Sequence, residues 1–449
     1  MRYILAVLLM VGMMAGAATA VTYEPTWESL DSRPNPAWFD EAKFGIFIHW
    51  GVYAVPAWGS KGKYSEWYWN DMMDPNGETW KFHLKTYGED FKYQDFAPMF
   101  KAEMFDPAQW ADIFARSGAK YVVLTSKHHE GFCLWPSPDS WNWNSVDIGP
   151  HRDLCGDLTQ AVRDRGLKMG FYYSLYEWFN PIYKTDVHRY VDQHMLPQLK
   201  DLVNRYQPSL IFSDGEWDHP SDVWRSTEFL AWLYNESPSR EDVIVDDRWG
   251  KDTRGHHGDY YTTEYGNIYQ APEDAFQKRK WEECRGMGAS FGYNRNETID
   301  EYKPAGELIH LLIELVARGG NLLLDIGPTA DGRIPVIMQQ RLLEIGDWLK
   351  ENGEGIYGSS PWRVNAEGDS VRYTTRDGAV YAHLLKWPGA ELALESPKAG
   401  GTVEASLLGW PEPLACKVEN GKIHISMPVI PPDNNKIRHA FVIRLKGVE

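Results

Sequence analysis

The chain has 449 residues, with 46 Lys or Arg against 63 Asp or Glu, and its formal net charge is −17. This balance argues against a nucleic-acid partner, because phosphate recognition needs a basic surface. A composition of 43% hydrophobic and 24% charged residues is that of a globular protein and excludes disorder and collagen-like repeats. Aromatic residues are unusually frequent, with 21 Trp, 24 Tyr and 17 Phe, and their flat faces can pack in a core or stack on sugar rings.

The N-terminus has the pattern of a secretory signal peptide over residues 1–20. Arg2 is followed by an apolar run, and Ala18-Thr19-Ala20 has the form of a cleavage site. A membrane anchor is the alternative, but the run is short for a spanning helix. We therefore expect export to a secreted, periplasmic or lysosome-like compartment, with no membrane span once the signal is removed.

Strand-like runs alternate with helical patterns from about residue 39 to residue 356, which is typical of βα units around a parallel sheet. Two weak strands are expected near Tyr260 and Ser290. Six clear strands are expected at 43–49, 119–126, 167–174, 209–214, 242–247 and 321–325. Together they would make the eight strands of a closed barrel.

Two of the intervening helices have clear end signals. Asp106 is an N-cap residue followed by Pro107, and Gly118 ends the apolar stripe of that helix. A later stripe runs from Met338 through positions spaced by four, three and four, and ends before Gly353. The whole alternation predicts an α/β fold, a (β/α)8-like TIM barrel over residues 21–356.

The pattern changes after Pro361-Trp362. Asp377-Gly378 and Asn420-Gly421 each separate two alternating segments, which predicts two β-hairpins. A last strand is expected at 438–445. Residues 357–449 are therefore predicted to form a C-terminal antiparallel β-sandwich.

Cysteine and histidine spacings give little support to a metal or redox site. Adjacent residues of a strand point to opposite faces, so one ion could not easily bind both members of the pairs His128-His129 or His256-His257. The four cysteines lack a C-x-x-C spacing: Cys133, Cys155, Cys284 and Cys416. We expect no metal and no cofactor, whereas disulfide pairing and a homo-oligomer stay open.

Polar residues follow four of the predicted strands. These residues are His49, His128-His129, Asp214 and Arg248. A polar strand end can simply meet water, but in a barrel of this kind the carboxyl ends of the strands carry the active site. Four such ends favour one shared site.

Asp214 is the strongest candidate for a catalytic carboxylate. Gly215 follows it and would let the backbone turn sharply, leaving the carboxylate open to a substrate. An N-cap role is the alternative, although the next helix is expected only near Ser221. Glycoside hydrolysis needs a second carboxyl group, and spacing leaves four candidates open: Glu264, Glu273, Glu282 and Glu283.

Six motifs occur in a fixed order, among them Ser213-Asp-Gly-Glu-Trp217 and Gly320-Asn-Leu-Leu-Leu-Asp-Ile-Gly-Pro328; the others cover 38–51, 64–68, 125–132 and 247–250. On these motifs the chain resembles the retaining α-L-fucosidases of glycoside hydrolase family 29, from about residue 25 to its end. The resemblance implies an exo-acting hydrolase that removes terminal α-L-fucose from oligosaccharides or glycoconjugates through a covalent fucosyl-enzyme. The competing hypothesis is a carbohydrate-binding barrel without catalysis, which the presence of both carboxylates disfavours.

The resemblance also implies roles for single residues. It makes Asp214 the nucleophile and Glu264 the acid/base, with Glu282 as second choice because members of the family differ at this point. Phe212 departs from the family, where Trp is frequent, and this changes one expected stacking wall. The implied fucose contacts are His49, Glu66, Trp67, His128, His129, Tyr172, Arg248 and Phe291.

Overall fold

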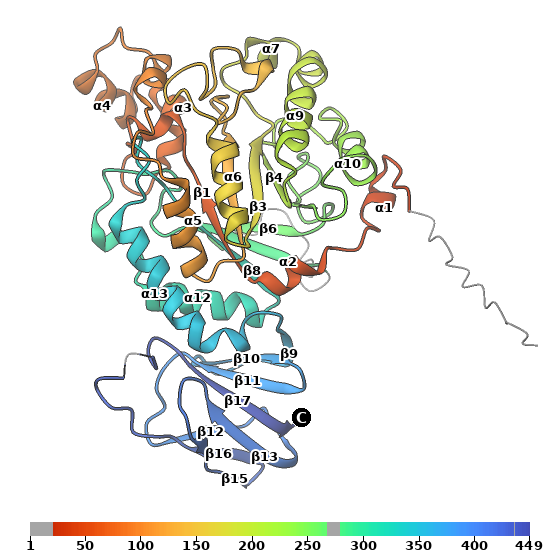
Figure 1. Ribbon diagram of the computed structural model, residues 1–449, viewed down its shortest axis with the longest axis vertical. Helices are drawn as coiled ribbons and strands as arrows, with labels where there is room; N and C mark the ends of the chain where they lie inside the picture. Colours follow the sequence, from red (N-terminus) through yellow and green to blue (C-terminus); the bar gives the residue numbers. More distant parts are fainter. Residues whose placement is uncertain (1–20, 267–278, 435) are drawn as a thin grey trace, which may run out of the picture.

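The N-terminal lobe of the computed structural model is a curled sheet of parallel strands surrounded by helices (Figure 1). The structure describes residues 21–266, 279–434 and 436–449, so the predicted signal segment 1–20 lies outside the described residues. Within them, eight parallel strands pair in the order β5-β4-β3-β2-β1-β8-β7-β6, which confirms the predicted barrel-like fold. The strands are β1 Phe44–Ile48, β2 Tyr121–Lys127, β3 Lys168–Ser174, β4 Leu210–Asp214, β5 Ile244–Val245, β6 Tyr261–Glu264, β7 Trp281–Gly286 and β8 Gly320–Ile326.

One predicted strand lies elsewhere in the chain. The sequence predicts a weak strand near Ser290, but the structure has β7 instead and an irregular loop around Ser290. β7 reads Trp-Glu-Glu-Cys-Arg-Gly, so it lacks the apolar run that marks a buried strand. Its carboxylates are buried through partners on other strands, since Tyr121 donates to Glu282 and Thr263 donates to Glu283. No local pattern could reveal these partners.

Side chains close the seam between β5 and β6, the two ends of the strand order. Asp259 Oδ2 accepts the N–H of Val245 at 2.9 Å, and the Val245 carbonyl accepts the N–H of Asp259 at 3.1 Å. Asp247 Oδ1 then accepts the N–H and the hydroxyl of Thr262 at 3.1 and 2.7 Å. Both aspartates are buried, and their hydrogen bonds satisfy backbone groups that a longer β5 would otherwise pair.

Helices cover the outside of the barrel. In α5 the Asp106 side chain accepts the N–H groups of Ala108 and Gln109, each at 3.0 Å, as an N-cap residue should. The predicted stripe from Met338 is buried in α13. The helices are α1 Trp27–Leu30, α2 Ala37–Ala42, α3 Tyr68–Met72, α4 Glu78–Thr86, α5 Pro107–Arg116, α6 Leu154–Asp164, α7 Pro181–Thr185, α8 Val187–Tyr190, α9 Leu196–Tyr206, α10 Ser226–Asn235, α12 Ala305–Ala317 and α13 Val336–Asn352.

The C-terminal lobe consists of antiparallel sheets packed face to face. A six-stranded sheet has the order β14-β13-β17-β11-β10-β9, and a three-stranded sheet has the order β12-β16-β15. Both predicted hairpins are present, with positive φ at Asp377, Gly378, Asn420 and Gly421. The strands are β9 Ser360–Glu367, β10 Val371–Arg376, β11 Ala379–Leu384, β12 Glu391–Leu394, β13 Ala399–Leu407, β14 Pro413–Leu414, β15 Cys416–Glu419, β16 Lys422–Ser426 and β17 Phe441–Val448.

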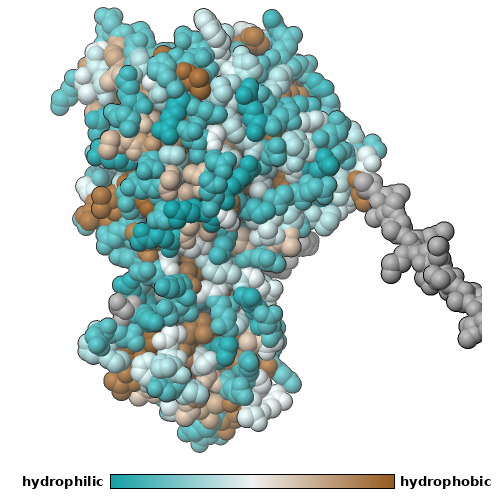
Figure 2. Space-filling view, in the orientation of Figure 1, coloured by the Kyte–Doolittle hydropathy of each residue, from teal (hydrophilic) through white to brown (hydrophobic). Residues whose placement is uncertain are grey.

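The two lobes meet along α12, which packs against β9 and β10 of the six-stranded sheet, and along α13 (Figure 1). Trp348 of α13 donates its indole N–H to the Ala440 carbonyl at 2.9 Å, and His310 of α12 contacts the His439 carbonyl at 2.8 Å. Figure 2 shows the same two lobes joined by a narrower waist, with a mainly hydrophilic surface. Among the described residues, no helix has the length and apolar character needed to cross a membrane.

We expect Asp106→Ala to lower the free energy of unfolding by about 0.5–2 kcal/mol, because two N–H groups of α5 lose their acceptor. Chemical denaturation followed by circular dichroism measures this change. Asp106→Asn keeps an acceptor at the same place and is the matched control, with a change of a few tenths of a kcal/mol. Equal destabilisation by both substitutions would contradict the cap assignment.

Candidate active site

A cavity of about 640 Å³ opens at the carboxyl ends of the barrel strands. Its lining includes Asp214, Glu264 and all eight residues that the sequence points to as contacts: His49, Glu66, Trp67, His128, His129, Tyr172, Arg248 and Phe291. The remaining lining residues are Phe47, Tyr64, Phe212, Glu216, Trp217, Lys251, Arg254 and Cys284. The structure thus brings the predicted site residues together around one hollow.

Asp214 is the last residue of β4 and lies in the cavity wall. Gly215 follows it with φ of +73°, and a Cβ there would lie 2.5 Å from the Cβ of Tyr176. Glycine alone accommodates both the dihedral angle and the close approach. The expected sharp turn is present, and α10 begins only at Ser226, so Asp214 does not cap that helix.

Arg248 connects the two candidate carboxylates. Its Nη1 donates to Asp214 Oδ1 at 2.8 Å, and its Nη2 donates to Glu264 Oε2 at 3.4 Å. The guanidinium lies over the ring of Phe212, 4.7 Å from the centroid, and its Nε donates to Thr262 Oγ1 at 3.1 Å. Because the side chain is only 3% exposed, its charge depends on the carboxylate of Asp214 for compensation.

The surroundings of Asp214 favour its ionised form. Burial alone would raise the pKa of Asp214, but the charges of Arg248 and Arg254 outweigh burial and hold this pKa well below its usual range. Arg254 Nη2 lies 3.7 Å from Oδ1, and the Tyr172 hydroxyl donates to Oδ2 at 2.8 Å. A buried carboxylate that stays ionised and is held at both oxygens can attack an electrophilic carbon.

Three consecutive residues after β5 explain how Arg248 reaches this position. Asp246 Oδ1 accepts the N–H and the hydroxyl of Ser213 at 3.1 and 2.8 Å, which fixes the segment to β4. Asp247 fixes it to β6 through the Thr262 contacts described above. Arg248 is therefore placed between the last residues of β4 and β6.

Glu264 is the last residue of β6, and its side chain is 14% exposed at the cavity wall. The Tyr64 hydroxyl donates to Glu264 Oε1 at 2.9 Å. A carboxyl group that is held at one oxygen by a tyrosine and faces the cavity can exchange a proton with a bound substrate.

The other candidate carboxylates lie away from the described lining. Glu282 is fully buried and accepts a hydrogen bond from Tyr121, and its burial raises its pKa to about 7. Glu283 accepts a hydrogen bond from Thr263 and is likewise absent from the described cavity wall. Glu273 lies outside the described residues.

His129 presents an acceptor nitrogen to the cavity. Its Nδ1 lies 2.6 Å from Ser174 Oγ, which in turn lies 2.6 Å from the Tyr176 carbonyl oxygen. Because the serine hydroxyl has one hydrogen and the carbonyl requires it, Nδ1 is the donor to Ser174. Burial and the neighbouring His128 lower the pKa of His129 well below its usual value. The neutral ring therefore keeps a lone pair on Nε2, 3.8 Å from Asp214 Oδ2.

His49 is oriented from behind by Asp325 of β8, with 2.7 Å between Nδ1 and Oδ1. Burial, with His128 beside it, lowers the pKa of His49, and burial together with Glu66 raises the pKa of Asp325. The two shifts favour a neutral imidazole next to a carboxylic acid. The ring is thus fixed without adding charge to the cavity.

Glu66 supports the loop that carries Phe291. The Gly292 N–H donates to Glu66 Oε2 at 2.8 Å, and the Ser290 hydroxyl donates to the Gly292 carbonyl at 2.8 Å. Burial raises the pKa of Glu66 to about 7. The Phe291 ring stands against His49, with 4.8 Å between the ring centroids, and closes one side of the cavity.

Both members of the pair His128-His129 line the cavity, contrary to the expectation that adjacent residues point to opposite faces. The reason is that β2 ends at Lys127, so the strict alternation of a strand no longer applies. His256 is exposed, and His257 contacts Asp31 away from the cavity at 2.8 Å. In the described part of the chain, no group of three or more His, Cys, Asp or Glu could hold a metal ion.

Several lining residues have no counterpart in the sequence-based prediction. Arg254 Nε donates to Glu216 Oε1 at 2.5 Å, and burial raises the pKa of Glu216. Glu216 lies in the motif 213–217 and Tyr64 in the motif 64–68, so the motifs could have indicated both as residues of the site. Arg254 comes from an irregular segment after β5 and carries no local signal.

Comparison with known proteins identifies the family. The α-L-fucosidase family model matches residues 10–354, and the model of the α-L-fucosidase C-terminal domain matches residues 365–446. The tissue α-L-fucosidase of Homo sapiens is 47% identical, covering 98% of this chain and 97% of that protein, and that of Bos taurus is 48% identical, covering 95% and 92%. The structure of Thermotoga maritima α-fucosidase in complex with fucose has a TM-score of 0.81 at 35% identity and covers 94% of this chain and all of that one. The chain belongs to the α-L-fucosidase family and is a glycoside hydrolase of that class.

Proposed function

We propose that this enzyme removes terminal α-L-fucose from glycans by a retaining double displacement, with Asp214 as nucleophile and Glu264 as acid/base. The observation that carries the proposal is the single guanidinium of Arg248 in contact with both carboxylates inside the cavity. Retaining glycosidases hold their two carboxyl groups about 5–5.5 Å apart. Arg248 brings Asp214 and Glu264 to one guanidinium, and two neighbouring carboxyl groups are what this mechanism requires.

In the first step, an oxygen of Asp214 attacks the anomeric carbon while the bond to the leaving oxygen breaks. Glu264 enters protonated and gives its proton to that oxygen. Asp214 can attack because Arg248 and Arg254 keep it ionised. The product of this step is a fucosyl ester of Asp214.

In the second step, water attacks the same carbon from the side that the leaving group vacated. Glu264 now accepts a proton from that water, and the ester bond to Asp214 breaks. Two inversions at one carbon retain the anomeric configuration. The cavity residues return to their starting protonation states.

The neutral histidines and the aromatic walls supply the fucose contacts in this proposal. His129 Nε2 would accept a hydrogen bond from a sugar hydroxyl, since Nδ1 already donates to Ser174. Trp67 and Phe291 would pack on the face that carries the C5 methyl group. We also propose, from the sequence, that residues 1–20 direct export of the chain. The sequence likewise predicts two units, residues 21–356 and residues 357–449.

Asp214→Gly tests the nucleophile. We expect the hydrolysis of 4-nitrophenyl α-L-fucoside to fall by about 10³-fold or more, because no carboxylate remains to form the ester. Azide fits the vacated space, so added azide should restore part of the turnover and give β-L-fucosyl azide, identified by NMR. Asp222→Gly, a loop carboxylate outside the described lining, is the control and should retain activity within a few-fold. An α-configured azide, or activity within tenfold of the wild type, would contradict the assignment.

Glu264→Gln and Glu282→Gln distinguish the two acid/base candidates. We expect Glu264→Gln to slow hydrolysis of a fucosylated disaccharide by about 10²–10⁴-fold, and to slow cleavage of 4-nitrophenyl α-L-fucoside less, because nitrophenolate leaves without protonation. Glu282→Gln still accepts the Tyr121 hydrogen bond behind the cavity and should change both rates only a few-fold. The measurement is the rate of hydrolysis of both substrates by each variant. A larger loss in Glu282→Gln than in Glu264→Gln would assign the acid/base role to Glu282.

Arg254→Gln tests the electrostatics of Asp214. This Arg lowers the pKa of Asp214, so its removal should raise that pKa. Activity that needs the ionised carboxylate is lost as pH falls through this pKa, so the acidic limb of kcat/KM should move to higher pH. Arg254→Lys keeps the charge and should leave the limb near its wild-type position. An unmoved limb in Arg254→Gln would contradict the argument.

A further inference from the structure

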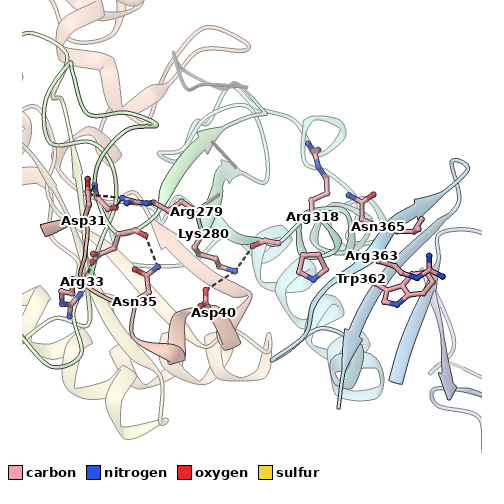
Figure 3. Close-up of a pocket in the computed structure, with 15 residues that line it drawn as sticks. Asp31, Arg33, Asn35, Asp40, Arg279, Lys280, Arg318, Trp362, Arg363 and Asn365 are labelled. Atoms are coloured by element: carbon pink, nitrogen blue, oxygen red, sulfur yellow. Dashed lines mark hydrogen bonds and ion pairs between the residues drawn. The ribbon is translucent and has the colours of Figure 1, made fainter. Parts of the chain in front are cut away.

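A second cleft, of about 900 Å³, lies at the opposite end of the barrel, where the two lobes meet (Figure 3). Its barrel residues directly precede β6, β7 and β8, whereas the active-site cavity lies at the other ends of the strands. Its outer wall comes from β9 of the C-terminal lobe. The lining residues with charged side chains are Asp31, Arg33, Asp40, Asp259, Arg279, Lys280, Arg318 and Arg363.

The cleft is locally cationic on a chain with a net charge of −17. Two of its carboxylates are taken by two of its arginines, since Arg33 lies 3.3 Å from Asp259 and Arg279 lies 3.1 Å from Asp31. These pairs form the wall on the barrel side in Figure 3. Lys280 lies 3.9 Å from Asp40, the third carboxylate of the lining, so the net positive charge resides on Arg318 and Arg363.

Lys280 lies on the floor of the cleft, next to a second amine, that of Lys43. Its Nζ donates to the Gly319 carbonyl at 3.0 Å and lies 3.9 Å from Asp40 Oδ1. Burial, and next the adjacent amine of Lys43, lower the pKa of Lys280 to about 7. Two neighbouring amines repel each other when both are protonated, and an anion bound beside them would relieve this repulsion.

Arg318 and Arg363 bring two guanidinium groups to the remaining walls. The Arg318 side chain, directly after α12, is 56% exposed, and the carboxylate of Glu314 in α12 lies 4.0 Å from it. Arg363 lies over the ring of Trp362, 4.6 Å from the centroid, and its Nη2 donates to backbone oxygens of Ser396 and Glu449, which lie outside the cleft lining. Gly319 joins these walls, because a Cβ there would lie 3.2 Å from the ring of Pro361.

We propose that this cleft binds an acidic glycan, a saccharide chain that carries sulfate or carboxylate groups. Guanidinium and ammonium groups on two walls and the floor match such anions. The volume is far larger than one sulfate and suits several sugar units, for which the amide of Asn365 offers hydrogen bonds. The site is separate from the fucose cavity and would hold a charged part of a glycan while another part is hydrolysed.

Isothermal titration of the full chain tests the proposal, with L-fucose present at saturation so that the active-site cavity is filled. The probes are a chondroitin 4-sulfate tetrasaccharide, its unsulfated uronate parent, neutral cellotetraose and inorganic sulfate. We expect both acidic tetrasaccharides to bind, more weakly as salt rises, and the ratio of their affinities reports whether sulfate or carboxylate is preferred. Neutral cellotetraose and inorganic sulfate should bind at least tenfold more weakly.

The double variant Arg318→Glu/Arg363→Glu tests whether the acidic tetrasaccharide binds in this cleft. It should weaken binding of the better acidic tetrasaccharide at least tenfold, whereas Arg189→Glu/Arg438→Glu, with the same charge change at other exposed positions, should change it less than twofold. Hydrolysis of 4-nitrophenyl α-L-fucoside should stay within twofold in both, which shows that the fold is intact. The proposal is overturned by equal binding of cellotetraose, by no binding of either acidic probe, or by equal effects of the two double variants.

Discussion

The buried guanidinium of Arg248 between Asp214 and Glu264 is the interaction on which the site depends. A charge that is almost fully withdrawn from water is tolerated only with charged and hydrogen-bonded partners. This one is compensated by the Asp214 carboxylate and contacts Glu264, with the Phe212 ring beneath it and Thr262 at its Nε. One group thus contacts both carboxyl groups and lowers the pKa of Asp214, which a retaining glycosidase needs in its ionised form for the attack.

β5 and β6, the strands on either side of Arg248, do not pair with each other in the sheet. β5 has two residues and lies at one end of the strand order, with β6 at the other. Buried aspartates close that seam, and Asp246 and Asp247 bind the neighbouring strands directly before Arg248. In a longer β5, backbone N–H and C=O groups would pair with the neighbouring strand. Here the side chains of Asp246, Asp247 and Asp259 accept those N–H groups, and the first two also orient Arg248. The β5–β6 seam, which side chains close in place of a strand ladder, therefore lies beside the functional centre.

Much of the fold follows from local pattern, and the exceptions have physical reasons. Apolar runs of β1 to β4 and the capped helix α5 are visible in the sequence because their burial depends on composition alone. β7 is hidden because its buried carboxylates are satisfied by Tyr121 and Thr263, which are far away in the chain. Arg254 reaches Asp214 from an irregular segment, and no spacing rule predicts such a contact. Motifs locate a residue on a strand end, but long-range hydrogen bonds decide which groups meet.

The central claim is that two carboxylates joined by one guanidinium catalyse two successive inversions at the anomeric carbon. Proton NMR of the hydrolysis of 4-nitrophenyl α-L-fucoside tests this claim most directly, because it identifies the anomer released before mutarotation mixes the two forms. The account predicts that α-L-fucose appears first and that the β anomer grows in later at the rate of spontaneous mutarotation. Initial release of β-L-fucose would mean a single inversion and would contradict the account.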